Sequence, residues 1–188
     1  MFLYFPVLLG TVREGRSSVH VARYVADRLG RRPEVEARLF DPKDLPFGNL
    51  VRREWEMDPV PPDVASFVRE MGRADGFVIV TPEYNYGIPG TLKNLLDHLF
   101  HEWNRKPFAL VGCGALSGGV RAVDQLRQVV TGLQGVVVPP QVYVTNVHST
   151  FGPGGPLAEA ETWNTRLDRM FSELEWYARA LSRARAGE

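Results

Sequence analysis

The chain has 188 residues, which is enough for a single domain spanning residues 1–188 to bury its own core without disulfides or metal ions. Its 22 lysine and arginine residues balance its 22 aspartate and glutamate residues, so the formal net charge is zero. We therefore expect neither a general nucleic-acid binder nor a protein that adheres to membrane surfaces, since both need a basic excess.

The chain begins with an apolar run from Phe2 to Leu9, which predicts a strand of a parallel sheet covered on both faces. The run is far shorter than the roughly 20 residues that a membrane span needs, so we expect no membrane span here. It lacks the basic leader and the small-residue cleavage site of a signal peptide, so we interpret it as a core strand. Pro6 removes one ladder donor, which favours a position early in the strand or at a bulge.

The loop from Gly10 to Ser18 joins this strand to a helix that begins near Val19, and the junction predicts a phosphate site. The first N–H groups of a helix have no partner within it, and the helix dipole favours negative charge there. Hydroxyl donors and two permanent cations complete the pattern: Thr11, Ser17, Ser18, Arg13 and Arg16. An ordinary turn with a serine helix cap is the simpler alternative.

The same loop nearly matches the nucleotide-triphosphatase motif G-x-x-x-x-G-K-[ST], running from Gly10 to Ser17. Arg16 stands where that motif has lysine, and its planar fork suits one terminal phosphate. Asp41, after the second predicted strand, is the best of several poor candidates for a magnesium ligand. A nucleotide triphosphatase or kinase therefore stays open as an alternative.

The rest of the chain alternates between helical and strand patterns. Helical spacing predicts helices over Val21–Leu29 (ended by Gly30), after a cap at Asp63, and over Leu92–Trp103, Val123–Leu133 and Leu167–Leu181. Short apolar runs predict strands at Val35–Phe40, Gly76–Val80, Phe108–Val111 and Gly135–Val144, the last split by Pro139 and Pro140. The proline-punctuated stretch 42–62 predicts an irregular excursion. This alternation predicts an α/β fold, a doubly wound sheet of about five parallel strands with helices on both faces.

Ligands of such folds collect at the carboxyl ends of the strands. Three loops occupy that edge, Gly10–Ser18, Thr81–Gly90 and Gly112–Gly119, and we expect them to converge. In the second loop two prolines and two glycines fix an unusual backbone. Such a loop can press backbone amides and an aromatic ring against a flat heterocycle.

Three spaced segments resemble the NADPH-dependent FMN reductase family, flavodoxin-like proteins that include quinone, chromate and azo-dye reductases. The family's first loop reads close to G-S-x-R-x-x-S, and this chain has Gly10, Thr11, Arg13, Arg16, Ser17 and Ser18 there, with threonine in place of the first serine. The second segment, P-E-Y-N, stands at Pro82, Glu83, Tyr84 and Asn85, followed by G-x-P-G-x-L-K-N from Gly87 to Asn94. The third combines Ser117, Gly118 and Gly119 with R-A-x-x-Q-L-R from Arg121 to Arg127. The resemblance runs from the first strand to about Val147.

The resemblance implies non-covalently bound FMN with its phosphate in the first loop. Its isoalloxazine ring would lie against Pro82–Asn85 and, at the pyrimidine edge, near Ser117–Gly119. The expected cofactor-binding residues are therefore Thr11, Arg13, Arg16, Ser17, Ser18, Pro82, Glu83, Tyr84, Asn85, Ser117, Gly118 and Gly119. NADPH or NADH is the expected co-substrate, and no protein residue is expected to be catalytic because the flavin carries the hydride. The family also implies a homodimer or homotetramer.

Other chemistry-bearing residues have simpler interpretations. Cys113, the one cysteine, suits a reducing cytoplasm and is interpreted as a small buried hydrophobe, not a nucleophile. His98 and His101 stand at i, i+3 without a clear third ligand, so we expect no metal site. Gly112-x-Gly114 lacks the third glycine of a dinucleotide fingerprint. Arg121 is either a contact for the 2′-phosphate of NADPH or a solvated helix residue, and both interpretations stay open.

Together these features predict an enzyme, an FMN-dependent NAD(P)H oxidoreductase that passes hydride to flavins, quinones or similar small acceptors in two half-reactions. A flavodoxin-type electron carrier is a further alternative, disfavoured because such carriers tend to be strongly acidic. The stretches 42–62 and 148–156 are expected to shape the choice of acceptor.

Overall fold

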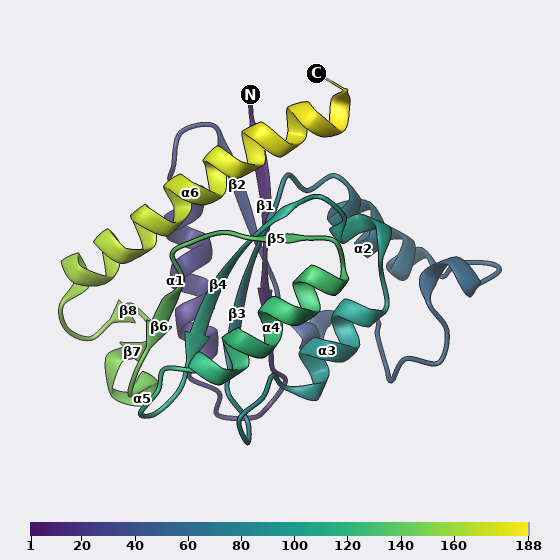
Figure 1. Ribbon diagram of the computed structural model, residues 1–188. Coiled ribbons are helices and arrows are strands. Elements are labelled where there is room, and N and C mark those ends of the chain that lie inside the picture. Colours follow the sequence, from purple (N-terminus) through teal and green to yellow (C-terminus); the bar gives the residue numbers. More distant parts are fainter. Residues whose placement is uncertain (188) are drawn as a thin grey trace.

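The computed structural model describes residues 1–187 and contains a parallel sheet with the strand order β2-β1-β3-β4-β5, in which β6 also pairs with β4 (Figure 1). The strands are β1 (Leu3–Leu9), β2 (Val35–Phe40), β3 (Phe77–Pro82), β4 (Pro107–Cys113), β5 (Val136–Val137) and β6 (Val142–Val144). β1 and β4 are buried along their whole length, as their continuous apolar sequence requires. This order confirms the predicted doubly wound, flavodoxin-like α/β fold.

The fifth predicted strand is divided into β5 and β6. β5 pairs with the beginning of β4, at Pro107, and β6 pairs with its end, from Val111 onward. The residues between them include Pro139 and Pro140, which have no backbone N–H to donate to a ladder. The predicted split is therefore confirmed.

Pro6 lies in the middle of β1, not at its beginning or at a bulge, so this expectation was wrong. Its register partner in β2 is Arg38. On the other side of β1 the ladder with β3 begins only at Val7, and Tyr4 donates its N–H to the Asp75 carboxylate at 2.9 Å. Because N–H groups alternate between the two sides of a strand, the missing donor of Pro6 falls on this side, just before the β3 ladder begins.

Helices cover both faces of the sheet (Figure 1). They are α1 (Ser18–Gly30), α2 (Pro62–Gly72), α3 (Gly90–Asp97), α4 (Val120–Gly132), α5 (Val147–Thr150) and α6 (Ala160–Ala186). The apolar sides of α1 and α6 pack against alternate residues of β1, such as Phe5 and Val7. The apolar sides of α2, α3 and α4 pack against the opposite face, which includes Leu8 and Ile79. Alternation along each strand thus builds two separate cores.

The third helix ends earlier than predicted. α3 stops at Asp97, and Trp103 follows in a separate 3₁₀ turn, His101–Trp103. The buried indole N–H of Trp103 donates to the carbonyl oxygens of Leu96 and Leu99 at 3.0 and 3.1 Å. These carbonyls lie at the end of α3 and just after it, where no further helical turn follows to supply N–H donors. The Trp103 side chain donates to them in place of those backbone N–H groups.

Asp63 does not cap α2, so this expectation was also wrong. The N-cap position is held by Pro61, and α2 begins at Pro62, where a missing N–H costs no helical bond. The Asp63 carboxylate lies in the first turn and accepts the N–H of Val64 at 2.9 Å.

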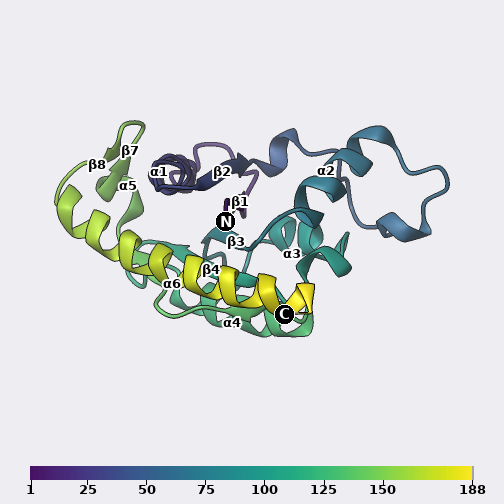
Figure 2. The same ribbon diagram turned by 90° about the horizontal axis from the view of Figure 1, so that it is seen from above.

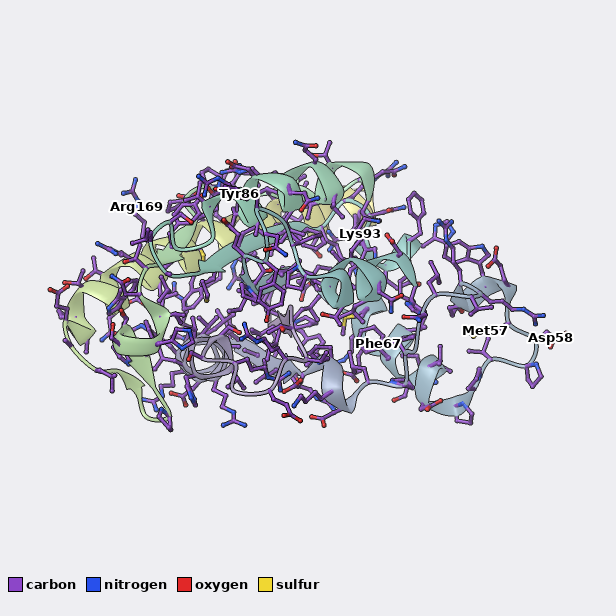
Figure 3. The ribbon with its side chains drawn as sticks, turned by 90° about the horizontal axis from the view of Figure 1, so that it is seen from below. Met57, Asp58, Phe67, Tyr86, Lys93 and Arg169 are labelled. Atoms are coloured by element: carbon purple, nitrogen blue, oxygen red, sulfur yellow. The ribbon has the colours of Figure 1, made fainter. Side chains whose placement is uncertain are left out.

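The stretch 42–62 is irregular, as predicted, with 3₁₀ turns at Pro42–Asp44 and Glu54–Glu56. It extends outward beside α2, away from the sheet (Figure 2). Figure 3 places Met57 and Asp58 at its tip, farther out than Phe67 of α2. The base is anchored by Phe47, whose ring centroid lies 5.1 Å from that of Phe67.

Candidate functional site

The three predicted loops meet at the carboxyl ends of β1, β3 and β4, so their expected convergence is confirmed. They enclose a cleft of about 180 Å³ together with residues of α5. The lining residues are Arg13, Gly15, Arg16, Ser17, Ser18, Pro82, Glu83, Tyr84, Cys113, Gly114, Ala115, Val147 and His148. Seven of these are predicted site residues. The other five lie in the three loops around the cleft: Thr11, Asn85, Ser117, Gly118 and Gly119.

In the first loop, Gly15 takes a left-handed backbone conformation with φ +65°, which turns the chain into α1. Arg16 is largely buried, and its guanidinium donates to the backbone carbonyl of Thr11 and to the carboxylate of Asp41. The cation of Arg16 is thereby paired within the protein. The triphosphatase alternative loses support. Arg16 stands at the lysine position of that motif and Asp41 was its best magnesium ligand, yet the two side chains bind each other.

The hydroxyl of Ser18 is an unpaired polar group at the edge of this cleft. Ser18 is 3% exposed and lies at the first position of α1, and its Oγ has no hydrogen-bond partner within residues 1–187. Ser17 stands at the N-cap, but its side chain does not cap the helix. A buried hydroxyl without a partner costs about 1–3 kcal/mol, so the site fits a ligand that accepts hydrogen bonds at the helix N-terminus.

The second loop is joined to the first through two hydroxyl groups. Thr11 is buried, and its Oγ1 lies 2.7 Å from the phenolic oxygen of Tyr84. Tyr84 and Gly87 exchange two backbone hydrogen bonds of 3.0 Å across a tight turn. The two central residues, Asn85 and Tyr86, are left-handed at φ 49° and 69°. Two prolines and two glycines were expected to fix this backbone; the left-handed conformations of its type I′ turn fall on non-glycine residues.

Glu83 connects the second loop to the third. Its backbone N–H donates to the Cys113 carbonyl at 3.2 Å, and its Oε2 accepts the backbone N–H of Arg121 at 3.0 Å. The Ser117 hydroxyl lies at 3.5 Å from the same oxygen. Arg121 adds an ion pair to Glu83 at 3.4 Å and stacks its guanidinium on the Tyr86 ring at 4.3 Å. Arg121, whose role was open, is thus held against the second loop.

The third loop depends on glycines because the chain folds back on itself there. Gly118 and Gly119 are left-handed, at φ 63° and 84°, and Gly119 is the N-cap of α4. A Cβ on Gly119 would lie 2.8 Å from the backbone nitrogen of Cys113. Gly114 is equally confined, since its Cβ would lie 2.9 Å from the nitrogen of Gly119. The backbone of this loop therefore lies so close to neighbouring backbone atoms that there is no room for a Cβ, and only glycine fits.

The fourth side of the cleft comes from α5, whose residue His148 begins the stretch 148–156 that was expected to shape the choice of acceptor. Val147 of α5 donates its N–H to the carbonyl of Gly114 at 3.1 Å, and the Nδ1 of His148 lies 2.7 Å from the Oγ of Ser17. Thr11–Tyr84, Glu83–Arg121, Val147–Gly114 and His148–Ser17 thus link four segments in a closed circuit around the cleft. A lone histidine in an irregular stretch belongs to no motif, so no sequence signal pointed to it.

Cys113 and His98 are both buried in the structure. Cys113 is fully buried at the end of β4, and burial raises the pKa of its thiol well above the ordinary range, so it is a buried thiol at the floor of the cleft. His98 is buried, with its Nδ1 at 2.7 Å from the Asn94 carbonyl oxygen. Within residues 1–187 no group of three or more metal-ligating side chains is gathered, and no helix is long and apolar enough to cross a bilayer.

The strand order and the cleft at the carboxyl ends of β1, β3 and β4 define a flavodoxin-like α/β protein. The family model for NADPH-dependent FMN reductase matches residues 5–149, and the chain belongs to this family.

Named relatives fall in the same group. The chain is 35% identical over 143 residues to an NAD(P)H-dependent FMN reductase of Schizosaccharomyces pombe, covering 74% of this chain and 71% of that one. It is 34% identical over 141 residues to a quinone reductase of Escherichia coli, covering 72% and 73%. Among solved structures, the flavoenzyme NAD(P)H:(acceptor) oxidoreductase of Paracoccus denitrificans superposes with a TM-score of 0.74 at 22% identity, covering 93% and 98%. That last likeness concerns the fold.

Proposed function

We propose that this protein is an FMN-dependent NAD(P)H oxidoreductase that passes hydride through bound FMN to a flavin, a quinone or a similar small acceptor. Membership of the FMN reductase family supports this assignment. The observation that carries it in the structure is the buried hydroxyl of Ser18, which has no partner among residues 1–187 and stands at the N-terminus of α1 in the cleft where three loops meet.

The phosphate of FMN is assigned to the first loop. Arg13 and Ser17 line the cleft beside Ser18, and the first N–H groups of α1 supply further donors. Arg16 lines the cleft too, but its charge is shared with Asp41, so its part is to hold the loop closed around Thr11. The hydroxyl of Thr11 is hydrogen-bonded to the hydroxyl of Tyr84, and Tyr84 lines the cleft.

The ring of FMN is assigned to the second and third loops. Pro82, Glu83 and Tyr84 line one side of the cleft, and Asn85 extends from it as an exposed residue. Ser117, Gly118 and Gly119 form the turn into α4. Glu83 accepts the N–H of Arg121, and the other first N–H groups of α4 favour negative charge at the pyrimidine edge. FMN, when bound, supplies the hydride chemistry; the protein binds the cofactor, orients it and excludes water from one face.

The co-substrate is NADPH or NADH, and the acceptor binds after it in a separate half-reaction on the same open face. A hollow that adjoins the cleft supports binding of these substrates, because it lies open beside the site assigned to the ring. It is lined by Tyr86, Leu116 and Arg121 together with Glu83. Leu116 is 90% exposed and Tyr86 is 70% exposed, which favours a homodimer or homotetramer in which a partner subunit completes the wall of this hollow. We assign the protein to the cytoplasm, where the free thiol of Cys113 stays reduced.

A spectrum of the purified protein tests the assignment. We expect a yellow protein that releases FMN on denaturation and oxidises NAD(P)H when a quinone is added. A colourless protein that does not bind added FMN would overturn it. Bound FMN without any NAD(P)H oxidation would favour an electron carrier, and magnesium-dependent binding of ATP or GTP would restore the triphosphatase alternative. Light scattering on a sizing column measures the oligomeric state.

A further inference from the structure

The polar end of the cleft is built by two segments, not by the first loop alone. His148 lines it next to Ser17 and Ser18, although it lies in α5, far along the chain. Its Nδ1 lies 2.7 Å from the Oγ of Ser17, the N-cap residue of α1. An imidazole is therefore hydrogen-bonded to the N-cap residue of α1, directly before the first helical residue.

His148 is held in this place from both sides. Asn146 and Val147 donate their N–H groups to the carbonyls of Ala115 and Gly114, at 2.6 and 3.1 Å, so the third loop carries one end of α5. Phe151, directly after α5, packs its ring edge-on against Tyr24 of α1, with centroids 5.8 Å apart. The position of His148 is thus set by backbone bonds and by aromatic packing.

The chemistry of this pair suits an anion. When the Ser17 hydroxyl donates to Nδ1, the proton of a neutral imidazole resides on Nε2, and a protonated imidazole also donates from Nε2. Within residues 1–187, His148 Nε2 makes no hydrogen bond, so it is available to a ligand. The unpaired buried hydroxyl of Ser18 stands in the same end of the cleft and needs an acceptor as well. A phosphate group offers several acceptor oxygens, which suits two donors at the same end of one cleft.

We propose that His148 donates a hydrogen bond to the phosphomonoester bound at the N-terminus of α1, so that this residue contributes to the selection of FMN over riboflavin. The inference deepens the proposed function and rests on it for the identity of the ligand. His148 is a binding residue supplied from outside the loop that carries the family's phosphate motif.

The experiment compares two ligands that differ only in the phosphate. Full-length protein freed of flavin is titrated with FMN and with riboflavin, and binding is followed by quenching of flavin fluorescence. The variants are His148→Ala, His148→Gln, which keeps a neutral donor, and two controls: the exposed Thr145→Ala just before α5 and the remote, exposed His101→Ala. Thermal unfolding without ligand checks that each variant is folded.

We expect His148→Ala to weaken FMN binding about tenfold and to leave riboflavin binding unchanged, because the lost contact is to the phosphate. His148→Gln should lose less, and both controls should match the wild type. Unchanged FMN affinity in His148→Ala overturns the inference, and so does an equal loss of FMN and riboflavin binding, which would mean that His148 only supports the cleft. If the wild type binds neither ligand, the proposed function itself fails, an outcome distinct from these.

Discussion

The carboxylate of Glu83, in the loop after β3, accepts a hydrogen bond at 3.0 Å from the backbone N–H of Arg121, in the first turn of α4. This contact does for α4 what a capping side chain does from within a helix, because the N-cap residue is Gly119 and has no side chain. The negative charge also lies at the positive end of the helix dipole. Glu83 therefore ties two of the site loops together through one helix end.

Replacing Glu83 with alanine is expected to destabilise the fold by about 1–2 kcal/mol, the usual cost of losing a charged capping group. Glu83→Gln keeps an acceptor oxygen and should lose about half as much. Urea unfolding followed by circular dichroism measures both. Asp124→Asn, an exposed carboxylate on the same helix, is the control and should change stability little. Equal stability of Glu83→Ala and Asp124→Asn would contradict the capping role.

Two glycines at the opposite ends of α4 make a second, internally matched test. Gly119→Ala places a Cβ 2.8 Å from the Cys113 nitrogen at φ 84°, so we expect a loss of about 2–4 kcal/mol. A Cβ on Gly132, in the last turn of α4, would meet no atom within 4 Å, and the φ of Gly132 is not positive. Gly132→Ala is therefore expected to be neutral or to stabilise by roughly 0.5 kcal/mol. Chemical denaturation of the two variants compares them directly.

Lys106 is buried directly before β4, at the opposite end of the strands from the site, and it makes the stability of the fold depend on pH. Its Nζ donates to the carbonyls of Met71 and Gly72, at the end of α2, at 2.9 and 2.8 Å. Burial, with a smaller contribution from the Arg185 charge, lowers the pKa of Lys106 from 10.5 to about 8. Between these two values the unfolded chain binds the proton more tightly than the folded protein does. The contribution of Lys106 to stability therefore rises as pH rises from 8 to 10.5 and is smallest below pH 8.

The measurement is the difference in unfolding free energy between wild type and Lys106→Met. We expect this difference to shift by on the order of 2–3 kcal/mol in favour of the wild type between pH 8 and 10.5. Taking the difference is necessary because burial also raises the pKa of Tyr4 and Cys113, and these two groups lower the stability as pH rises. Lys93→Met, an exposed lysine of α3, should show a flat difference. A flat profile for Lys106→Met would contradict the prediction.

The sequence predicts the fold well because the fold follows from hydrophobic spacing alone. The apolar runs of β1 and β3 and the stripes of α4 and α6 need no knowledge of partners, and ligand loops at strand ends follow from the topology. The predicted end of a helix was wrong where a side-chain hydrogen bond replaced backbone ones. At the end of α3 the indole N–H of Trp103 binds carbonyls that a longer helix would have bonded through its backbone.

The pairing of polar groups within the site could not be predicted. Arg16 was expected among the phosphate-binding residues, and nothing in the motif indicated that Asp41, directly after β2, pairs with its charge. Glu83 and His148 likewise meet partners from α4 and α1, which only the folded arrangement brings near. A motif gives the residue types at one loop, whereas the hydrogen bonds depend on what the neighbouring loops present. The loop that supplies His148 carries no motif at all.

Ser18 offers the test that separates folding from binding most clearly. Its buried hydroxyl has no partner within residues 1–187, so removing it relieves a desolvation cost. Ser18→Ala is therefore expected to leave the flavin-free protein as stable as the wild type, or more stable by up to about 1 kcal/mol. The same change should weaken FMN binding about tenfold, because the phosphate loses a donor at the helix N-terminus.

Thermal unfolding with and without FMN measures both effects at once, since a ligand stabilises the folded state by an amount that rises with the logarithm of its affinity. The wild type should gain more from FMN than Ser18→Ala does, and the two should gain equally from riboflavin. Ser66→Ala, an exposed serine of α2, is the control and should behave as the wild type in every condition. A Ser18→Ala variant that is less stable without flavin would show that the hydroxyl has a partner inside the protein, and the phosphate site would then need another donor in its place.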